Sequence, residues 1–154
     1  MNPETRNYRL EDFLRDLSSD DRLPGSGAAG AVALALAAAC AAKAAAITLK
    51  HAPNDSRLRR AHEKLLSYID AAIAGSDADM QRFARFLHLR TAEAARGVIA
   101  ADQKLLGLIS ALTESLQSLD QQVRRSVSGD LAAARALTQA ARTIELENIS
   151  ELST

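Results

Sequence analysis

Two features of the sequence bring together residue types that can do chemistry. The turn PGSGA, residues 24–28, opens a long apolar segment, and backbone amides at a helix start bind anions. Its two glycines allow a ligand to approach the backbone closely. Lys43 lies inside the apolar segment, and a desolvated lysine with a lowered pKa can act as an acid, a base or an anion anchor.

Each feature also has a plainer interpretation. Glycine and proline are common turn residues, so PGSGA can simply be a tight turn into a helix. No Gly-Lys-Ser/Thr follows it and no strand precedes it, which excludes the common nucleotide-binding loops. Lys43 can extend its charge to the surface past its own methylenes. The three histidines show no metal-ligand spacing, so the sequence predicts no metal site.

The elements that must position these residues are helices. Apolar residues recur at steps of three and four along most of the chain, and no stretch alternates as a strand does. The sequence therefore predicts an all-α fold, an antiparallel bundle of five to seven helices around a buried Ala-rich central helix, in one domain over residues 1–154. The first two predicted helices cover residues 10–17 and 26–51. A third begins at Asn54 or Asp55 and stops at Gly75, and a fourth begins at a capping box of Ser76 and Asp79. An apolar stripe over 105–127 marks a further helix, and a last helix is capped by Ser128 or Asp130 and ends near Asn148. Thr91 either caps a fresh helix or lies within a continuous one.

Composition excludes several classes of protein. Nineteen basic and nineteen acidic residues give zero net charge, and aromatic residues are only 3%, so we expect no nucleic-acid partner. Alanine is nearly neutral for insertion and Lys43 would cost about 2.5–3.5 kcal/mol at a bilayer centre, so we expect no membrane span. Cys40 cannot form an internal disulfide, and the polar N-terminal residues show no secretory signal. These observations favour a cytoplasmic protein.

The sequence resembles the cyclodeaminase/cyclohydrolase family, which includes the C-terminal domain of formiminotransferase-cyclodeaminase and free-standing methenyltetrahydrofolate cyclohydrolases. The segments EDFLRDLSS, PGSGA and AITLKH match its N-terminal pattern, with Pro24 and Thr48 separated by 24 residues. Near the C-terminus, Asp130-Leu131 and Asn148-Ile149 match a second pair of family positions. Asp79 and Phe83 give a weaker third match.

The resemblance implies a helical homodimer that acts on one-carbon derivatives of tetrahydrofolate, either formimino-tetrahydrofolate as a cyclodeaminase or the methenyl form as a hydrolase. It implies a folate substrate and no permanently bound cofactor. The turn residues Pro24, Gly25, Ser26 and Gly27 would bind a substrate carboxylate or the pterin edge, and Asn148 would position the substrate. Asp130 would be the acid or base, and Lys43 an anion anchor.

An alternative belongs to another class of protein. Ser26 replaces the middle glycine of the family turn, Ala28 replaces its serine, and the middle of the chain is shorter than in the family. These departures motivate a catalytically inactive dimeric relative that serves as a subunit or binding protein.

Overall fold

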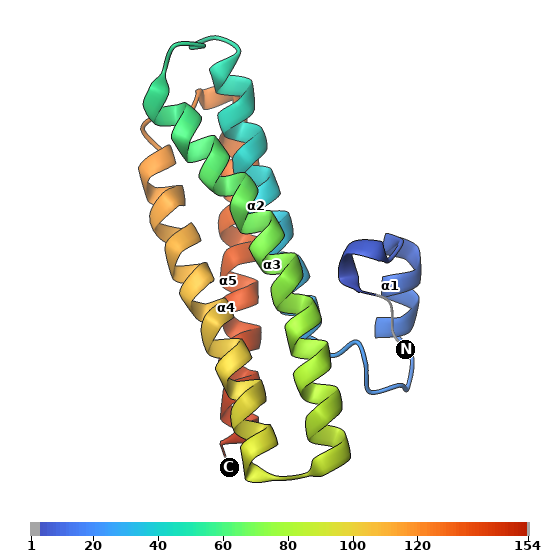
Figure 1. Cartoon of the computed structure of the whole chain (residues 1–154). Coiled ribbons are helices and arrows are strands. Elements are labelled where there is room, and N and C mark those ends of the chain that lie inside the picture. Colours follow the sequence, from blue (N-terminus) through green and yellow to red (C-terminus); the bar gives the residue numbers. More distant parts are fainter. Residues whose placement is uncertain (1–3, 154) are drawn as a thin grey trace.

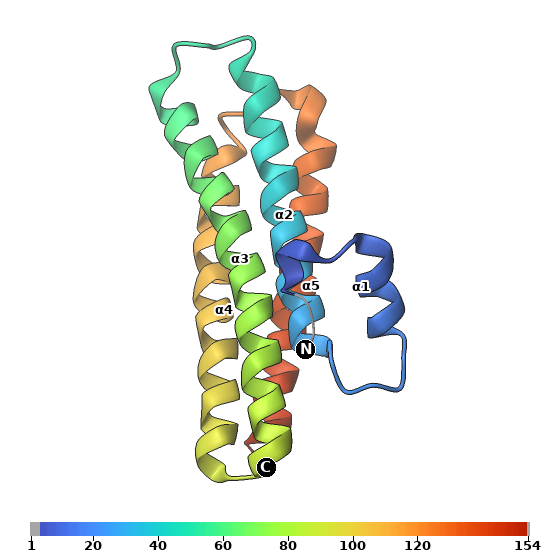
Figure 2. The same cartoon turned by 45° about the vertical axis from the view of Figure 1, so that its right-hand side comes forward.

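The computed structural model describes residues 4–153 as four long helices in a bundle, with a short helix beside it (Figures 1 and 2). The described residues contain no strand, so the predicted all-α fold is confirmed. The single domain predicted over 1–154 includes residues 1–3 and 154, which lie outside the described residues. The elements are η1 (Thr5–Asn7), α1 (Leu10–Leu17), α2 (Ser26–Leu49), α3 (Ser56–Leu89), α4 (Ala92–Leu119), η2 (Arg125–Val127) and α5 (Ser128–Leu152).

The Ala-rich helix α2 is the centre of the bundle. It packs most extensively against α3 and α5, and both of these helices run antiparallel to it. Its buried positions are nearly all alanine or glycine, with Leu34 as the largest fully buried side chain. Small side chains let the helix backbones come close together. The larger leucines and Ile109 of α4 fill the remaining core.

The same helix has the length and apolar composition of a membrane span. It is the single described helix that meets these criteria, and half of its most apolar window is buried inside the bundle. Core helices of bundles share this length and composition, so the finding is weak support for a membrane location.

The third helix is continuous where the sequence analysis predicts two helices. α3 passes through Gly75 without a break. A Cβ at this position would lie 2.5 Å from Cδ2 of Leu105, so the glycine allows α3 and α4 to pack closely. The predicted capping box is also wrong, because Ser76 and Asp79 are buried in the interior of the helix.

The starts of α3 and α4 are capped by side chains. Of the two predicted caps for α3, Asp55 is the one used, and its carboxylate accepts hydrogen bonds from two backbone N–H groups of the first turn. At the start of α4, Thr91 Oγ1 accepts from the N–H of Ala94 at 3.2 Å. Thr91 therefore begins a fresh helix, which decides the alternative that the sequence leaves open.

The last helix begins without a side-chain cap. Val127 occupies the N-cap position of α5, so the prediction that Ser128 or Asp130 caps this helix is wrong. The 3-10 turn η2 leads directly into α5 and replaces the cap. The helix also continues to Leu152, beyond the predicted end near Asn148.

Thr48 connects the end of α2 to the loop before α5. Its buried hydroxyl donates to the carbonyl of Ala44 at 2.9 Å and accepts from the N–H of Arg124 at 3.1 Å. This residue, one of the positions that carry the family resemblance, thus has a structural role at the end of the bundle far from the PGSGA turn.

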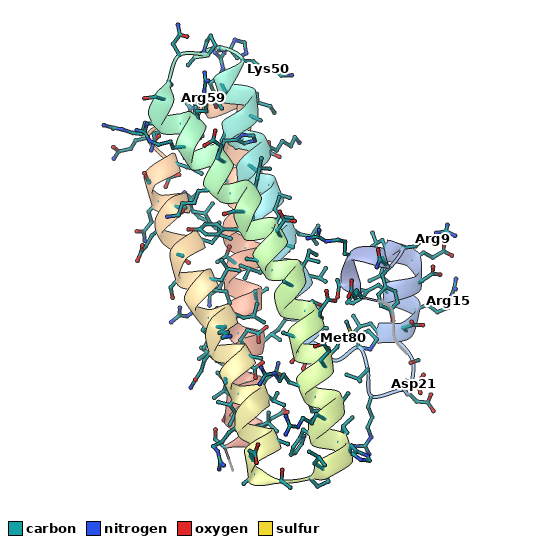
Figure 3. All side chains as sticks on the ribbon, in the orientation of Figure 1. Arg9, Arg15, Asp21, Lys50, Arg59 and Met80 are labelled. Carbon is teal, nitrogen blue, oxygen red and sulfur yellow. The ribbon has the colours of Figure 1, made fainter. Side chains whose placement is uncertain are left out.

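The N-terminal helix α1 lies outside the four-helix bundle (Figure 1). Phe13 buries its ring against Ala28 and Met80 in a small cluster separate from the main core. Figure 3 labels Met80 on the side of α3 that faces α1. The 3-10 turn η1 is tied to α3, because Thr5 Oγ1 donates to Ser76 Oγ at 2.8 Å. These contacts hold the chain against the bundle before it enters α2.

Candidate functional site

A pocket lies where α2 begins. Asp79 on α3 faces the first turn of α2, yet α3 continues to Leu89, about three helical turns further. The lower parts of α3, α4 and α5 therefore extend past the start of α2 (Figure 2). The space that a fourth helix would fill remains as a cavity of about 110 Å³. Its lining residues are Gly25, Ser26, Gly27, Asp79, Phe83, Val98, Asp102, Asn148, Glu151 and Leu152.

The structure brings together most of the substrate-binding residues that the sequence analysis predicts. Gly25, Ser26 and Gly27 form one side of the pocket, and Asn148 approaches from α5. Ser26 Oγ donates a hydrogen bond to Asn148 Oδ1 at 2.7 Å. Because this bond uses the amide oxygen, the NH₂ group of Asn148 keeps its donors for other partners. Pro24 is buried next to the turn and does not line the cavity.

The two residues predicted to be catalytic lie together, but away from this pocket. Lys43 Nζ contacts Asp130 Oδ1 at 3.1 Å, and 63% of the lysine side chain is exposed. Lys43 is seventeen residues along α2 from Ser26, or about 25 Å. Lys43 lies near the end of α2 and Asp130 in the first turn of α5, so the pair is toward the end of the bundle where Figure 3 labels Lys50 and Arg59. The lysine thus reaches the surface, and roles for Lys43 and Asp130 in catalysis stay predictions.

Asp79 occupies the anion-binding start of α2. Its carboxylate accepts a hydrogen bond from the backbone N–H of Ala28, in a helix whose N-cap residue, Gly25, supplies no side-chain acceptor. Gly27 makes this contact possible, since a Cβ there would lie 2.5 Å from Asp79 Oδ1. The carboxylate held at the PGSGA turn is therefore one that the protein itself provides.

Burial changes the acidity of Asp79. The side chain is almost fully buried, and desolvation raises its pKa to about 6. The hydrogen bond from Ala28 acts in the opposite direction and lowers the pKa, but it is the smaller effect. Near neutral pH this carboxyl group can therefore either accept or donate a proton, which is what a general acid–base residue needs.

Asp102 and Glu145 form a second acidic feature deeper in the bundle. Asp102 comes from α4 and Glu145 from α5, and both are fully buried. Within the described part of the chain, no N–H or alcohol group donates a hydrogen bond to their four carboxyl oxygens. The two groups face one another, and the pKa of each responds to a hydrogen bond with the other. Asp102 lines the pocket, whereas Glu145 lies behind it.

Desolvation is the main cause of a raised pKa in both residues. It raises the pKa of Asp102 to about 7, with the charge of Asp79 as a further cause, while the hydrogen bond from Glu145 lowers it. The pKa of Glu145 rises to about 9, through desolvation and then through the negative charges of Asp102 and Asp79. At neutral pH Glu145 therefore carries a proton and Asp102 is close to its midpoint.

A Gly30→Ala variant tests whether Glu145 fills the space that the structure assigns to it. A Cβ at Gly30 would collide with Glu145 Oε1 and would approach Ile144 Cγ2 to 3.1 Å. We expect the free energy of unfolding to fall by roughly 1–3 kcal/mol, measured by urea denaturation. Gly107→Ala is the matched control, because nothing lies within 4 Å of the added carbon and alanine favours a helix interior by roughly 0.5–1 kcal/mol. Equal effects of the two substitutions would contradict the assignment.

Sequence reasoning alone did not identify the three carboxyl groups as a site. Asp79 is predicted as the partner of Ser76 in a capping box and as part of a weak family match, while Asp102 and Glu145 are not singled out. A usable signal exists: Asp102 lies three residues before Leu105 and four after Val98, in the apolar stripe of α4. An acid at a core position is a candidate functional group. Over residues 4–153, no three His, Cys, Asp or Glu side chains are placed to hold a metal ion.

Comparisons with known proteins agree with this fold. The family model described as formiminotransferase-cyclodeaminase matches residues 9–150. Among solved structures, the chain is similar to the crystal structure of formiminotetrahydrofolate cyclodeaminase from Thermotoga maritima, with a TM-score of 0.92 and 19% sequence identity. The match covers 97% of this chain and 80% of that one, and at this identity it shows the fold alone. A comparison with curated proteins gives no match.

Proposed function

Because the chain belongs to the formiminotransferase-cyclodeaminase family, we propose that it acts on the one-carbon unit of a tetrahydrofolate. The preferred reaction is cyclisation of formimino-tetrahydrofolate to the methenyl form with release of ammonia. The related reaction, hydrolysis of the methenyl bridge, attacks the same carbon with water, breaks one C–N bond of the bridge and needs the same kind of proton transfer. The observation that carries the proposal is the pocket at the start of α2, where Asp79 and Asp102 present buried carboxyl groups.

The charge of the substrate fits these carboxyl groups. A protonated formimino group and a methenyl bridge are both cations delocalised over a carbon and two nitrogens. A carboxylate in a partly desolvated pocket attracts such a cation more strongly than one in water. Asp79 and Asp102 would bind the reacting end of the substrate, and Asn148 would donate hydrogen bonds to it from the NH₂ group that faces away from Ser26.

The reaction also needs a group that moves a proton. The attacking folate nitrogen must lose a proton, and the departing nitrogen must gain one to leave as ammonia. A carboxyl group with a pKa near 7 can accept the first proton and return the second. Asp102 has that pKa and lines the pocket, so we assign it as the acid–base residue.

The cavity size indicates which part of the substrate it accepts. A cavity of about 150 Å³ in another protein holds a benzene molecule. At about 110 Å³ the pocket accommodates a small group such as the one-carbon unit and its nitrogens. The remainder of the folate would lie outside it, with the ring of Phe83 as the apolar wall at the mouth.

The expected homodimer and cytoplasmic location belong to the same proposal. The outward face of α2 carries a row of apolar residues that the bundle leaves partly exposed, and Leu36 is 52% exposed. This face is the surface on which a second copy would pack. Cys40 lies in the same row, and a free thiol fits a reducing cytoplasm.

An assay with two substrates tests the proposed function. The purified protein is incubated with formimino-tetrahydrofolate while methenyl-tetrahydrofolate absorbance and released ammonia are followed together. Separately, loss of added methenyl-tetrahydrofolate is measured above its uncatalysed rate. We expect the first reaction to be accelerated, with ammonia and product formed in equal amounts. Calorimetric binding of the folate without turnover of either substrate would instead identify an inactive, folate-binding relative.

A further inference from the structure

Asp102 and Glu145 are two buried carboxyl groups whose negative charges, if both were ionised, no group lining the pocket would compensate. Both side chains have no exposed surface, and among residues 4–153 no N–H or alcohol group donates a hydrogen bond to any of their four oxygens. Two ionised carboxylates in contact would repel one another and would lack the solvation that each requires. A proton held between them removes the repulsion and supplies the missing hydrogen bond.

The surrounding helices keep this pair close together. On one side, α2 presents Gly30, which has no side chain in the place that Glu145 occupies. The charged group of another helix that acts on the pair is also acidic, namely Asp79 from α3. Glu151, on α5 like Glu145, lines the wall of the pocket. The negative charge of Asp79 therefore favours retention of a proton on the pair.

From this geometry we propose that Glu145 is a positioning residue that shares one proton with Asp102 and keeps Asp102 in the carboxylate form facing the substrate. The proposal rests on the proposed function for its reaction. The protonated carboxyl of Glu145 donates to Asp102, and Asp102 alone of the two reaches the pocket. Without that donor, desolvation would keep Asp102 protonated at neutral pH, and it could not accept a proton.

The proton balance of the cyclisation shows what the pair does. The neighbouring folate nitrogen forms a bond to the carbon of the protonated formimino group, and the C=N pair moves onto the formimino nitrogen. The attacking nitrogen gives its proton to Asp102, so that the pair holds two protons. One of them then passes to the formimino nitrogen, whose C–N bond breaks with its electrons as ammonia leaves. A nitrogen lone pair closes the methenyl C=N bond, and the pair returns to one proton.

The first experiment observes the shared proton without any substrate. The whole protein is labelled with ¹³C at its Asp and Glu carboxyl carbons and titrated by NMR from acidic to alkaline pH. We expect the signals of Asp102 and Glu145 each to move in two steps, because each residue senses both ionisations of the pair. In Glu145→Gln we expect the Asp102 signal to shift in two different steps, one when Asp79 ionises and one when Asp102 itself ionises. Independent single-step titration of the two residues in the unmodified protein would overturn the proposal.

The second experiment measures how kcat for formimino-tetrahydrofolate depends on pH. In Glu145→Gln the amide still donates to Asp102, so we expect the acid limb to stay in place and kcat at pH 7 to remain within about threefold. In Glu145→Leu the donor is lost, so we expect the acid limb to move up by about one pH unit and kcat at pH 7 to fall roughly fivefold. Glu147→Gln, an exposed position on the same helix, is the control with no expected change.

The outcomes separate this proposal from the proposed function. Two-step NMR titration in a protein that turns over neither folate would support the shared proton and contradict the folate reaction. Turnover with an acid limb that does not move in a folded Glu145→Leu protein would support the reaction and overturn the role of Glu145. If Glu145→Leu does not fold, a Glu145→Gln protein as inactive as Asp102→Asn would also overturn it, because the amide preserves the proposed hydrogen bond.

Discussion

An Asp102→Asn variant is expected to lose about 100- to 10,000-fold in kcat for formimino-tetrahydrofolate, because the amide can neither accept nor return the transferred proton. Asparagine has nearly the shape of aspartate and can still hydrogen-bond with Glu145, so the fold should survive the change. The loss should fall on kcat, with a smaller effect on KM, since Asp79, Asn148 and the part of the folate outside the pocket would keep most of the proposed substrate contacts. Steady-state kinetics by methenyl-tetrahydrofolate absorbance measures both parameters.

Glu114→Gln is a suitable control for this variant. Glu114 is an exposed acid on the same helix, so the substitution removes one negative charge from α4 without touching the pocket. We expect its kcat to remain within about twofold of the unmodified protein, as is usual for an exposed surface change. A folded Asp102→Asn protein with unchanged kcat would remove Asp102 from the mechanism. Asp130→Asn, assayed beside it, tests the role that the sequence predicts for Asp130.

Stability is expected to decrease as the pH rises from about 5 to 9. In the folded protein, burial raises the pKa of Asp79, Asp102 and Glu145 above the values of an unfolded chain. The folded state therefore holds protons that the unfolded state has already released. Each such group lowers the free energy of unfolding by about 1.4 kcal/mol per pH unit between its unfolded and folded pKa. The stabilising contribution is complete below the unfolded pKa values. It is lost progressively as the pH rises, and the loss ends at about pH 6 for Asp79, 7 for Asp102 and 9 for Glu145.

Urea denaturation at several pH values checks this expectation. Glu145 has the widest interval between its unfolded and folded pKa, so Glu145→Gln should flatten the alkaline part of the curve most. Glu147→Gln, two residues away and exposed, should leave the curve unchanged. A curve that stays flat from pH 5 to 9 in the unmodified protein would contradict the raised pKa values and would show that the carboxyl groups are solvated in the folded state.

The fold was largely predictable because local patterns determine most of it. The apolar stripe of α4 indicates a helix without reference to other segments. In the same way, the proline and polar residues after α2 indicate a loop. Gly75 shows the limit of such reasoning. A glycine in a helical pattern signals an end when only its own segment is considered. The structural reason for a glycine at this position is the side chain of Leu105, thirty residues away, which packs where a Cβ would lie. No local pattern identifies that contact.

The site was predictable only where the family resemblance reached it. The resemblance pointed to the turn and to Asn148, and the structure places them within one hydrogen bond of each other. The spacing of Asp79 from Ser76 imitates the capping box of a helix start, so the local pattern predicts a capping role for these two residues. Glu145 follows Ile144, which takes the apolar position in the sequence pattern, so a local pattern places the acid on the surface. Packing against the other helices buries it instead.

The three acids of the site stand on three separate helices, and none belongs to a loop. The connection between α2 and α3, residues 50–55, lies at the end of the bundle far from the pocket, near Lys50 and Arg59 in Figure 3. That connection can consequently lengthen, shorten or accept an inserted domain without moving a reacting group. The end of the bundle with residues 50–55 is therefore open to change by evolution or protein engineering, while the opposite end keeps the pocket and its three acids in place.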